Sequence, residues 1–241
     1  MRRKTKIISA ISSFIFIIIL VGILFFIGVI KINVPSLAQY PIRGVDVSEY
    51  QGHIDWDLIE QQGIQFAFIK ATEGSGYVDP FFLANWEAVE STKLLVGAYH
   101  FFSFDSPAQT QSERFIATVE PKIGMLPPVV DVELYGKHKN NHPNAEVVRA
   151  QLNIMLDMLE AQYGAKPIIY ATQQSYSLYI DGHYAQYPLW IRDVYFTPSS
   201  NVEWTFWQYS DKGKLDGYDG REQYIDMNVY FKDEAELAKL R

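Results

Sequence analysis

Four acidic residues lie at the ends of short apolar runs, where strand formation disfavours aspartate. They are Asp46, Asp131, Glu133 and Asp226. Side chains alternate between the faces of a strand, so Asp131 and Glu133 point one way and Val132 points the other. Two carboxylates at such a short separation resist simultaneous ionisation, so the pKa of one of them should rise. A carboxylic acid that keeps its proton near neutral pH can act as a general acid at a glycosidic oxygen. The ordinary alternative is a pair of solvated acids beyond a strand end.

Aromatic side chains accompany these carboxylates. Flat rings beside carboxylates suit a pocket for sugar rings, whereas the ordinary interpretation is a packed core. We expect Phe101, Trp207 and Tyr209 to belong to the core, because neighbouring strand residues face opposite ways. The predicted substrate-binding residues at strand ends are Tyr77, Tyr99, Tyr170, Trp190 and Gln208.

Other chemistries find little support. His138 and His142 are four residues apart in an Asn-rich loop with no third ligand nearby, so we expect no metal site. The stretch Gly74-Ser75-Gly76 lacks the lysine and the spacing of a phosphate-binding loop. The absence of cysteine excludes thiolate ligands and a cysteine nucleophile. We therefore expect neither a metal nor a cofactor.

Eight short apolar runs must position these residues. Their length and their β-branched or aromatic content predict buried strands, and helical patterns between the early runs predict a parallel sheet. The last runs follow one another too closely for full crossover helices. These patterns predict an α/β fold, a barrel with helices after the first five strands only and with its active site at the carboxyl ends of the strands. The expected strands are Ile42–Val47, Phe66–Lys70, Leu94–Phe102, Pro128–Glu133, Pro167–Tyr170, Leu189–Ile191, Thr205–Tyr209 and Tyr224–Asp226.

Five helices are expected between the early strands. An Asp or Asn before a helix accepts hydrogen bonds from its free N–H groups, and a glycine often ends it. A Ser-Pro pair is typical of a cap followed by a proline in the first turn. The expected helices are Asp55 to Gly63, Pro80 to Lys93, one opening at Ser106-Pro107, Asn144 to Gly164, and one beginning at Ser175 to Tyr179.

The net charge of −7 is the sum over two segments of opposite charge. Residues 1–34 hold five basic residues and no acidic ones, and the remainder has 16 basic against 28 acidic residues. The acidic balance argues against a nucleic-acid partner. Residues 7–30 carry no charge and are long enough to span a bilayer as a helix, with the basic tip on the cytoplasmic side. A cleavable signal peptide with a site near Ala38 is the alternative, although the apolar run exceeds a usual signal sequence.

The predicted organisation is therefore a cytoplasmic tip (1–6), a transmembrane signal-anchor (7–30), a stalk (31–41) and a catalytic barrel (42–241). This predicts a single-pass protein of the cell membrane whose barrel lies outside the cytoplasm, in a periplasm or at the cell exterior. We expect a monomer in contact with the lipid bilayer through its amino-terminal helix.

The motifs resemble those of glycoside hydrolase family 25, the Chalaropsis-type lysozymes. Each motif is weak alone, but eight in the same order are specific. The matching stretches are Gly44-Val45-Asp46-Val47-Ser48, Phe68-Ile69-Lys70-Ala71-Thr72-Glu73-Gly74 with Tyr77-Val78-Asp79-Pro80, Gly97-Ala98-Tyr99-His100-Phe101, Asp131-Val132-Glu133, Pro167-Ile168-Ile169-Tyr170, Pro188-Leu189-Trp190-Ile191, Trp207-Gln208-Tyr209-Ser210 and Ile225-Asp226-Met227-Asn228.

The resemblance implies an irregular TIM-like (β/α)5(β)3 barrel that cleaves the β-1,4 bond between N-acetylmuramic acid and N-acetylglucosamine in peptidoglycan. It implies that Glu133 is the general acid, that Asp131 assists it, and that Asp46 and Asp226 complete the acidic set. Arg192-Asp193-Val194 depart from the small residue and tyrosine that many members carry after the Trp-Ile pair. A chitinase-like glycosidase and a non-catalytic peptidoglycan-binding protein are the alternatives.

Overall fold

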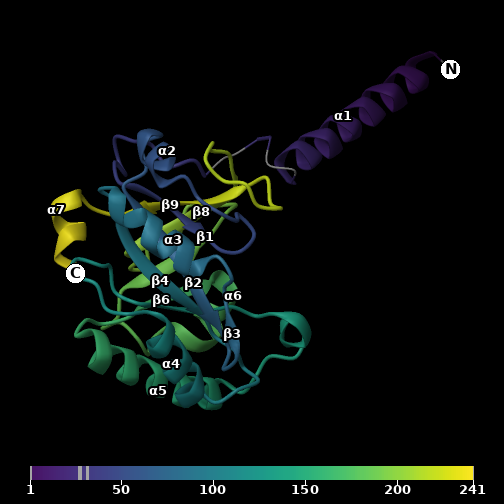
Figure 1. Ribbon diagram of the computed structural model, residues 1–241. Helices are drawn as coiled ribbons and strands as arrows, with labels where there is room; N and C mark the ends of the chain where they lie inside the picture. Colours follow the sequence, from purple (N-terminus) through teal and green to yellow (C-terminus); the bar gives the residue numbers. More distant parts are fainter. Residues whose placement is uncertain (1, 27–28, 31–32, 241) are drawn as a thin grey trace. The chain divides into compact units, whose positions relative to one another are not determined.

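A computed structural model describes residues 2–26, 29–30 and 33–240 (Figure 1). The chain forms two units, Met1–Val34 and Pro35–Arg241. The first unit contains one long helix. The second contains every strand that the described residues form.

The helix of the first unit, α1, spans Arg2–Phe26. It begins inside the basic tip and ends before Ile30, where the predicted transmembrane segment should end. Residues 27, 28, 31 and 32, which belong to the predicted segment and stalk, lie outside the described residues. Within the described part of the chain, no helix combines the length and the apolar character needed to cross a bilayer. The predicted transmembrane anchor is therefore not supported.

The second unit is a closed eight-stranded barrel, as predicted. A short two-residue strand, β3, pairs with the end of β2, and pairing of β1 with β2 closes the barrel. The strands are β1 (Arg43–Val47), β2 (Phe66–Glu73), β3 (Tyr77–Val78), β4 (Leu95–Phe101), β5 (Val129–Val132), β6 (Ile168–Thr172), β7 (Leu189–Arg192), β8 (Phe206–Gly213) and β9 (Ile225–Tyr230).

One strand runs against the predicted direction. The barrel strands from β1 to β8 are parallel to their neighbours, but β9 is antiparallel to both β8 and β1. Residues 214–224, between β8 and β9, form no helix, and a connection this short can join antiparallel strands but not parallel ones. Asp226, expected at the carboxyl end of its strand, is the second residue of β9. Because β9 is reversed, Asp226 still reaches the same end of the barrel.

A helical segment follows each of the first five barrel strands and, among the described residues, none lies between β7 and β9, as the shrinking spacing predicts, while the short α7 and η4 come after β9. α2 (Trp56–Gln61) begins at its cap Asp55, which accepts a hydrogen bond from Leu58 N at 3.0 Å. α5 (Ala145–Tyr163) is capped by Asn144 and ends at Gly164, whose φ of +69° is a left-handed conformation that suits glycine. The remaining helical segments are α3 (Phe82–Ala88) with η1 (Val89–Ser91), α4 (Ala108–Thr118), η2 (Gly136–Lys139), α6 (Gln173–Ser175) with the π-helical η3 (Tyr176–Ile180), α7 (Glu234–Leu237) and η4 (Ala238–Leu240).

Three helix starts differ from the prediction, the first being α3, which begins at Phe82 rather than at Pro80. Ser106 makes no capping bond, because the free backbone N–H of Ala108 donates to Gln151 Oε1 on α5 at 2.8 Å. α4 therefore begins at Ala108, after Pro107. The fifth helical segment begins at Gln173 and is capped by the Thr172 side chain, rather than beginning at Ser175.

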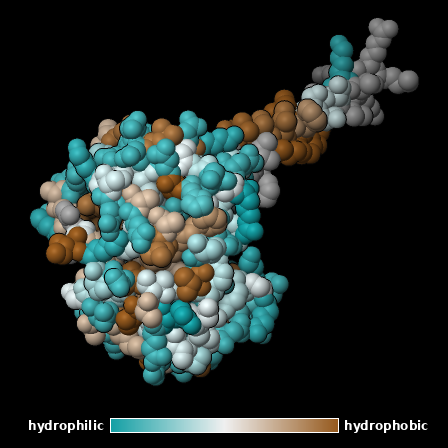
Figure 2. Space-filling view, viewed as in Figure 1, coloured by the Kyte–Doolittle hydropathy of each residue, from teal (hydrophilic) through white to brown (hydrophobic). Residues whose placement is uncertain are grey.

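Large aromatic rings fill the barrel interior. Phe66 and Phe68 point inward from β2, whereas Ala67 and Ile69 point outward and pack in the layer beneath the helices. Phe68 stacks on Trp190 with ring centroids 4.7 Å apart. The outer surface of this unit is mostly hydrophilic on the face in view (Figure 2). The ring layer thus closes the barrel below the carboxyl ends of its parallel strands.

Candidate active site

A cleft of about 850 Å³ opens at the carboxyl ends of the parallel strands. It brings together the four predicted acidic residues, which lie on or directly after three separate strands, β1, β5 and β9. Four of the five predicted substrate-binding residues also line it, namely Tyr99, Tyr170, Trp190 and Gln208. The site residues predicted from strand ends therefore meet in one cavity, with the exception of Tyr77.

Asp46 and Asp226 form a carboxyl pair across the β1–β9 junction. They are directly opposite in the antiparallel register. Burial raises the pKa of Asp46 to about 6, although hydrogen bonds from Asn228 and Gln208 oppose the rise. Burial and the neighbouring charge of Asp46 raise the pKa of Asp226 well above its usual range. Within this pair, Asp226 is therefore the carboxyl more strongly favoured to hold a proton, and Asp46 is the one that ionises more readily.

The ionised Asp46 is held by two oriented amides. Its Oδ1 accepts hydrogen bonds from Asn228 Nδ2 at 2.7 Å and from Gln208 Nε2 at 2.9 Å. An amide presents either its oxygen or its NH₂ group, so something must fix the orientation of each.

The buried aromatic residues fix both amides. Trp190 Nε1, which can only donate, gives its hydrogen to Asn228 Oδ1 at 2.8 Å. The Tyr170 hydroxyl donates to Gln208 Oε1 at 2.8 Å. Both amides must then turn their NH₂ groups toward Asp46. Trp190 and Tyr170 thus act on the carboxylate through Asn228 and Gln208, in addition to lining the cleft.

The Asp131–Glu133 pair lies at the end of β5. Asp131 is 7% exposed, and its Oδ1 is buried with no hydrogen-bond partner among the described residues. Burial first, and the charge of Glu133 second, raise the pKa of Asp131 well above its usual range. The expected rise in one pKa of the pair therefore falls on Asp131. Glu133 follows the last residue of β5, and its side chain is more exposed in the cleft than that of Asp131.

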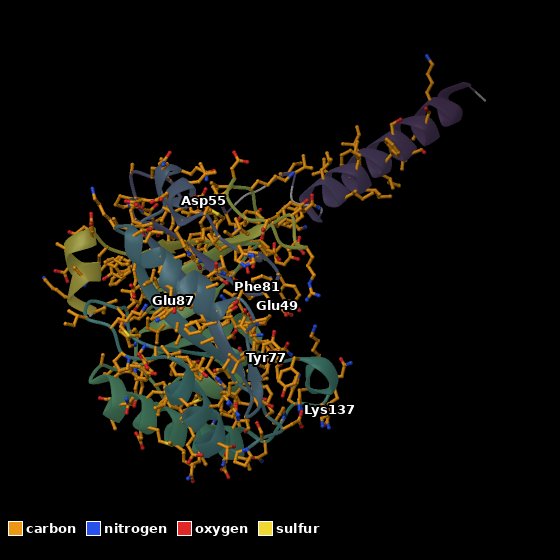
Figure 3. The ribbon with its side chains drawn as sticks, viewed as in Figure 1. Glu49, Asp55, Tyr77, Phe81, Glu87 and Lys137 are labelled. Atoms are coloured by element: carbon orange, nitrogen blue, oxygen red, sulfur yellow. The ribbon has the colours of Figure 1, made fainter. Side chains whose placement is uncertain are left out.

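Two aromatic expectations need correction. Tyr77 lies outside the residues that line the cleft: it sits on β3, 37% exposed, near Glu49 (Figure 3). Its hydroxyl is bonded to Glu49, and burial together with this bond raises its pKa. Phe101, expected in the core, is half-buried and lines the cleft, whereas Trp207 and Tyr209 are buried as predicted. Phe101 is the last residue of β4, where an inward side chain meets the cavity instead of the ring layer.

Asn228 was missed as a site residue. A periodic signal was present, because Asn228 is two residues after Asp226 and strand side chains two apart share a face. Arg192, Tyr135 and Lys70 also line the cleft.

The two histidines considered as metal ligands, His138 and His142, contact other side chains of the protein. His138 Nε2 lies 3.1 Å from Asp105 Oδ2, and His142 Nε2 lies 3.1 Å from Gln174 Nε2. Over the described residues, no group of three or more His, Cys, Asp and Glu side chains is arranged to hold a metal ion.

Comparisons with known proteins agree with this geometry. The model of glycosyl hydrolases family 25 matches residues 45–218. The chain is similar to a solved family 25 glycosyl hydrolase from Bacillus anthracis, with 50% identity and a TM-score of 0.81 over 86% of this chain and 96% of that one. It is also similar to protein YegX of Escherichia coli O157:H7, with 39% identity over 86% of this chain and 75% of the relative. Lysozyme M1 of Streptomyces globisporus is 29% identical over 83% of this chain and 71% of the relative.

Proposed function

The chain belongs to glycosyl hydrolases family 25 and is a glycoside hydrolase of the lysozyme type, and on that premise we propose that it is an N-acetylmuramidase. The reaction is hydrolysis of the β-1,4 bond between N-acetylmuramic acid and N-acetylglucosamine in peptidoglycan, as part of wall catabolism or remodelling. The observation that carries this proposal is the convergence of Asp46, Asp131, Glu133 and Asp226 in one cleft lined by aromatic rings.

We assign the general acid to Glu133. Its side chain is more accessible than that of Asp131 and lies at the rim of β5, where a glycosidic oxygen in the cleft can approach it. Asp131 lies deeper, with a buried oxygen that lacks a partner among the described residues. Asp131 nevertheless lines the cleft beside Glu133, and we propose that it assists by orienting the acetamido group of the sugar.

The Asp46–Asp226 pair would stabilise positive charge. A transition state with oxocarbenium character gains from a nearby carboxylate. Asp46 is the member held ionised, because Asn228 and Gln208 both donate to it. Its charge is fixed in place before substrate arrives, so no reorganisation is needed during the reaction.

The test is turnover of purified peptidoglycan by the full chain and by Glu133→Gln. Loss of acid catalysis should lower kcat by about 10²–10⁴-fold. Glu87→Gln is the matched control, since Glu87 is exposed on α3 and away from the cleft lining (Figure 3). Muropeptides with muramic acid at the new reducing end confirm the bond, whereas equal activity of both enzymes would refute the assignment of Glu133. Cleavage of chitin oligomers but not peptidoglycan would favour the chitinase-like alternative, and binding without turnover would favour the non-catalytic one.

The proposed substrate lies outside the cytoplasm, and we propose that the barrel works there. Digestion of the barrel by protease added to intact cells or spheroplasts tests this location. A barrel that stays intact until the cytoplasmic membrane is broken would contradict it. The monomeric state expected from the sequence stays a prediction.

A further inference from the structure

The cleft faces an electrostatic difficulty with the substrate proposed above. Asp46, Asp131, Glu133 and Asp226 line it together with Glu73. The muramic acid of peptidoglycan is itself a source of carboxylates, from its lactyl group when this is free and from its peptides when these are attached. Those carboxylates of the cleft that are ionised repel an anionic polymer, and a cation placed where the carboxylates of the polymer lie would offset this repulsion.

Three cationic side chains line the cleft, and two are poorly suited. Lys70 Nζ bonds to Glu73 Oε2 at 2.6 Å, and its side chain is only 12% exposed. It also lies 5.2 Å from the Phe101 ring centroid, so its ammonium is enclosed between a carboxylate and a ring and is less accessible to a ligand than the Arg192 side chain. Lys139 is exposed at the end of the short η2 segment, where a flexible ammonium has little to orient it.

Arg192 is differently placed. It is the last residue of β7, next to Gln208 in the register with β8, and its side chain is 30% exposed in the cleft. Its Nη2 donates to Asp211 Oδ2 at 2.9 Å. A guanidinium has five N–H donors, and this is the one hydrogen bond of the Arg192 side chain found among the described residues. Asp211 thus orients the guanidinium group of Arg192. Most of the N–H donors of that group stay available for the two oxygens of a carboxylate.

We propose that Arg192 is a specificity-determining residue that binds a carboxylate carried by muramic acid. The carboxylate is that of the free lactyl group or that of an attached peptide, which share the same chemistry. This inference rests on the proposed muramidase function and adds the means by which the cleft selects an anionic glycan.

The experiment uses the full chain with Arg192→Gln, Arg192→Lys and the control Arg221→Gln. Arg221 also forms an ion pair, with Glu49 at 3.0 Å, but lies outside the residues that line the cleft. Three soluble substrates are compared: glycan strands freed of peptides, the same strands with their lactyl carboxylates converted to neutral amides, and strands that keep their peptides.

For the wild-type enzyme, KM should be about tenfold lower on strands with a free lactyl carboxylate than on the amidated strands, since hydrogen bonds to charged groups are strong. Arg192→Gln should abolish this difference by raising KM on the charged strands alone, with kcat little changed. Arg192→Lys should recover part of the preference, because it keeps the charge and loses the fork. If the Arg192→Gln effect is confined to peptide-bearing strands, the peptide is the source of the carboxylate and the inference still holds.

The result that overturns the inference is a change in KM that is equal on charged and neutral strands, or no change at all. Loss of Arg192 also removes a charge that lowers the pKa of Asp226. That indirect effect would act on every substrate alike. The comparison of charged with neutral strands therefore separates it from the loss of a contact to the carboxylate. If the wild-type enzyme cleaves none of the strands, the proposed function fails as well, which distinguishes the two failures.

Discussion

Replacing Asn228 by leucine should make the stability of the barrel depend more steeply on pH. Leucine has a similar size, but it removes the donor that lies 2.7 Å from Asp46 Oδ1 and the acceptor that receives the Trp190 N–H. The first loss affects a charged group whose ionisation depends on pH. The second affects a neutral indole whose hydrogen bonding does not.

The magnitude follows from these two bonds. The folded-state pKa of Asp46 is about 6, above its ordinary value of 3.8, so the folded chain keeps a proton that the unfolded chain loses. The favourable contribution of this proton is complete at low pH and is lost as pH rises between about 4 and 6, at a cost of about 3 kcal/mol. Without Asn228 the pKa rises further, which costs about 2 kcal/mol more once Asp46 ionises. An unsatisfied Trp190 N–H adds about 2 kcal/mol at any pH.

Urea unfolding of the full chain, followed by near-UV circular dichroism, measures the effect. Asn228→Leu should lower the free energy of unfolding by about 2 kcal/mol at pH ~5 and by about 4 kcal/mol at pH ~8. Asn144→Ala is the matched control, because the Asn144 side chain accepts from backbone N–H groups and contacts no carboxylate in its capping role. It should cost about 1 kcal/mol at both pH values. An equal loss at both pH values for Asn228→Leu would refute the view that Asn228 stabilises an ionised Asp46.

Two further predictions concern the layers around the site. His100 is buried between Thr72 Oγ1 at 2.7 Å and Gln111 Oε1 at 2.9 Å, and burial lowers its pKa to about 4. Its contribution to stability is therefore full above pH ~6.5 and is lost as pH falls toward 4, and His100→Gln should flatten acid unfolding over this range by about 3 kcal/mol. An unchanged slope in urea unfolding between these pH values would contradict this. Gly97→Ala should destabilise the barrel by about 1–3 kcal/mol in thermal unfolding, because a Cβ there would lie 2.8 Å from the Phe68 ring. Gly76→Ala, with nothing within 4 Å of the added Cβ, is the control, and an equal loss in both variants would show that ring packing is not the cause.

Local signals were sufficient to locate the eight barrel strands and some of the helix ends, but they did not reveal β3. Asp55, Asn144 and Gly164 act within one turn of chain, and the structure places each at the helix end that its chemistry predicts. The direction of β9 could not be predicted from such local signals. It depends on how residues 214–224 fold and on the strands with which β9 pairs. For a similar reason, Ser106 does not cap its helix. The backbone N–H of Ala108 instead donates to Gln151, a residue of α5 that is far away in the sequence.

The candidate site shows the same division. The acidic residues could be predicted because carboxylates in apolar runs are unusual, and the cleft contains all four. The amide orientation could not be predicted, because it depends on contacts between β6 and β8 and between β7 and β9. Tyr77 followed the same strand-end reasoning as Tyr99, but the β3 extension carries it outside the cleft lining.

The reversed strand β9 has a consequence for when the enzyme becomes able to act during its synthesis. The Asp46–Asp226 pair joins the first barrel strand to the last, so nearly the whole chain separates its two members. A nascent chain that stops before residue 225 lacks Asp226 opposite Asp46, lacks the Asn228 amide that donates to Asp46, and lacks the strand that pairs with both β8 and β1. A hydrolase built in this order has no complete Asp46–Asp226 pair until its final strand has been added.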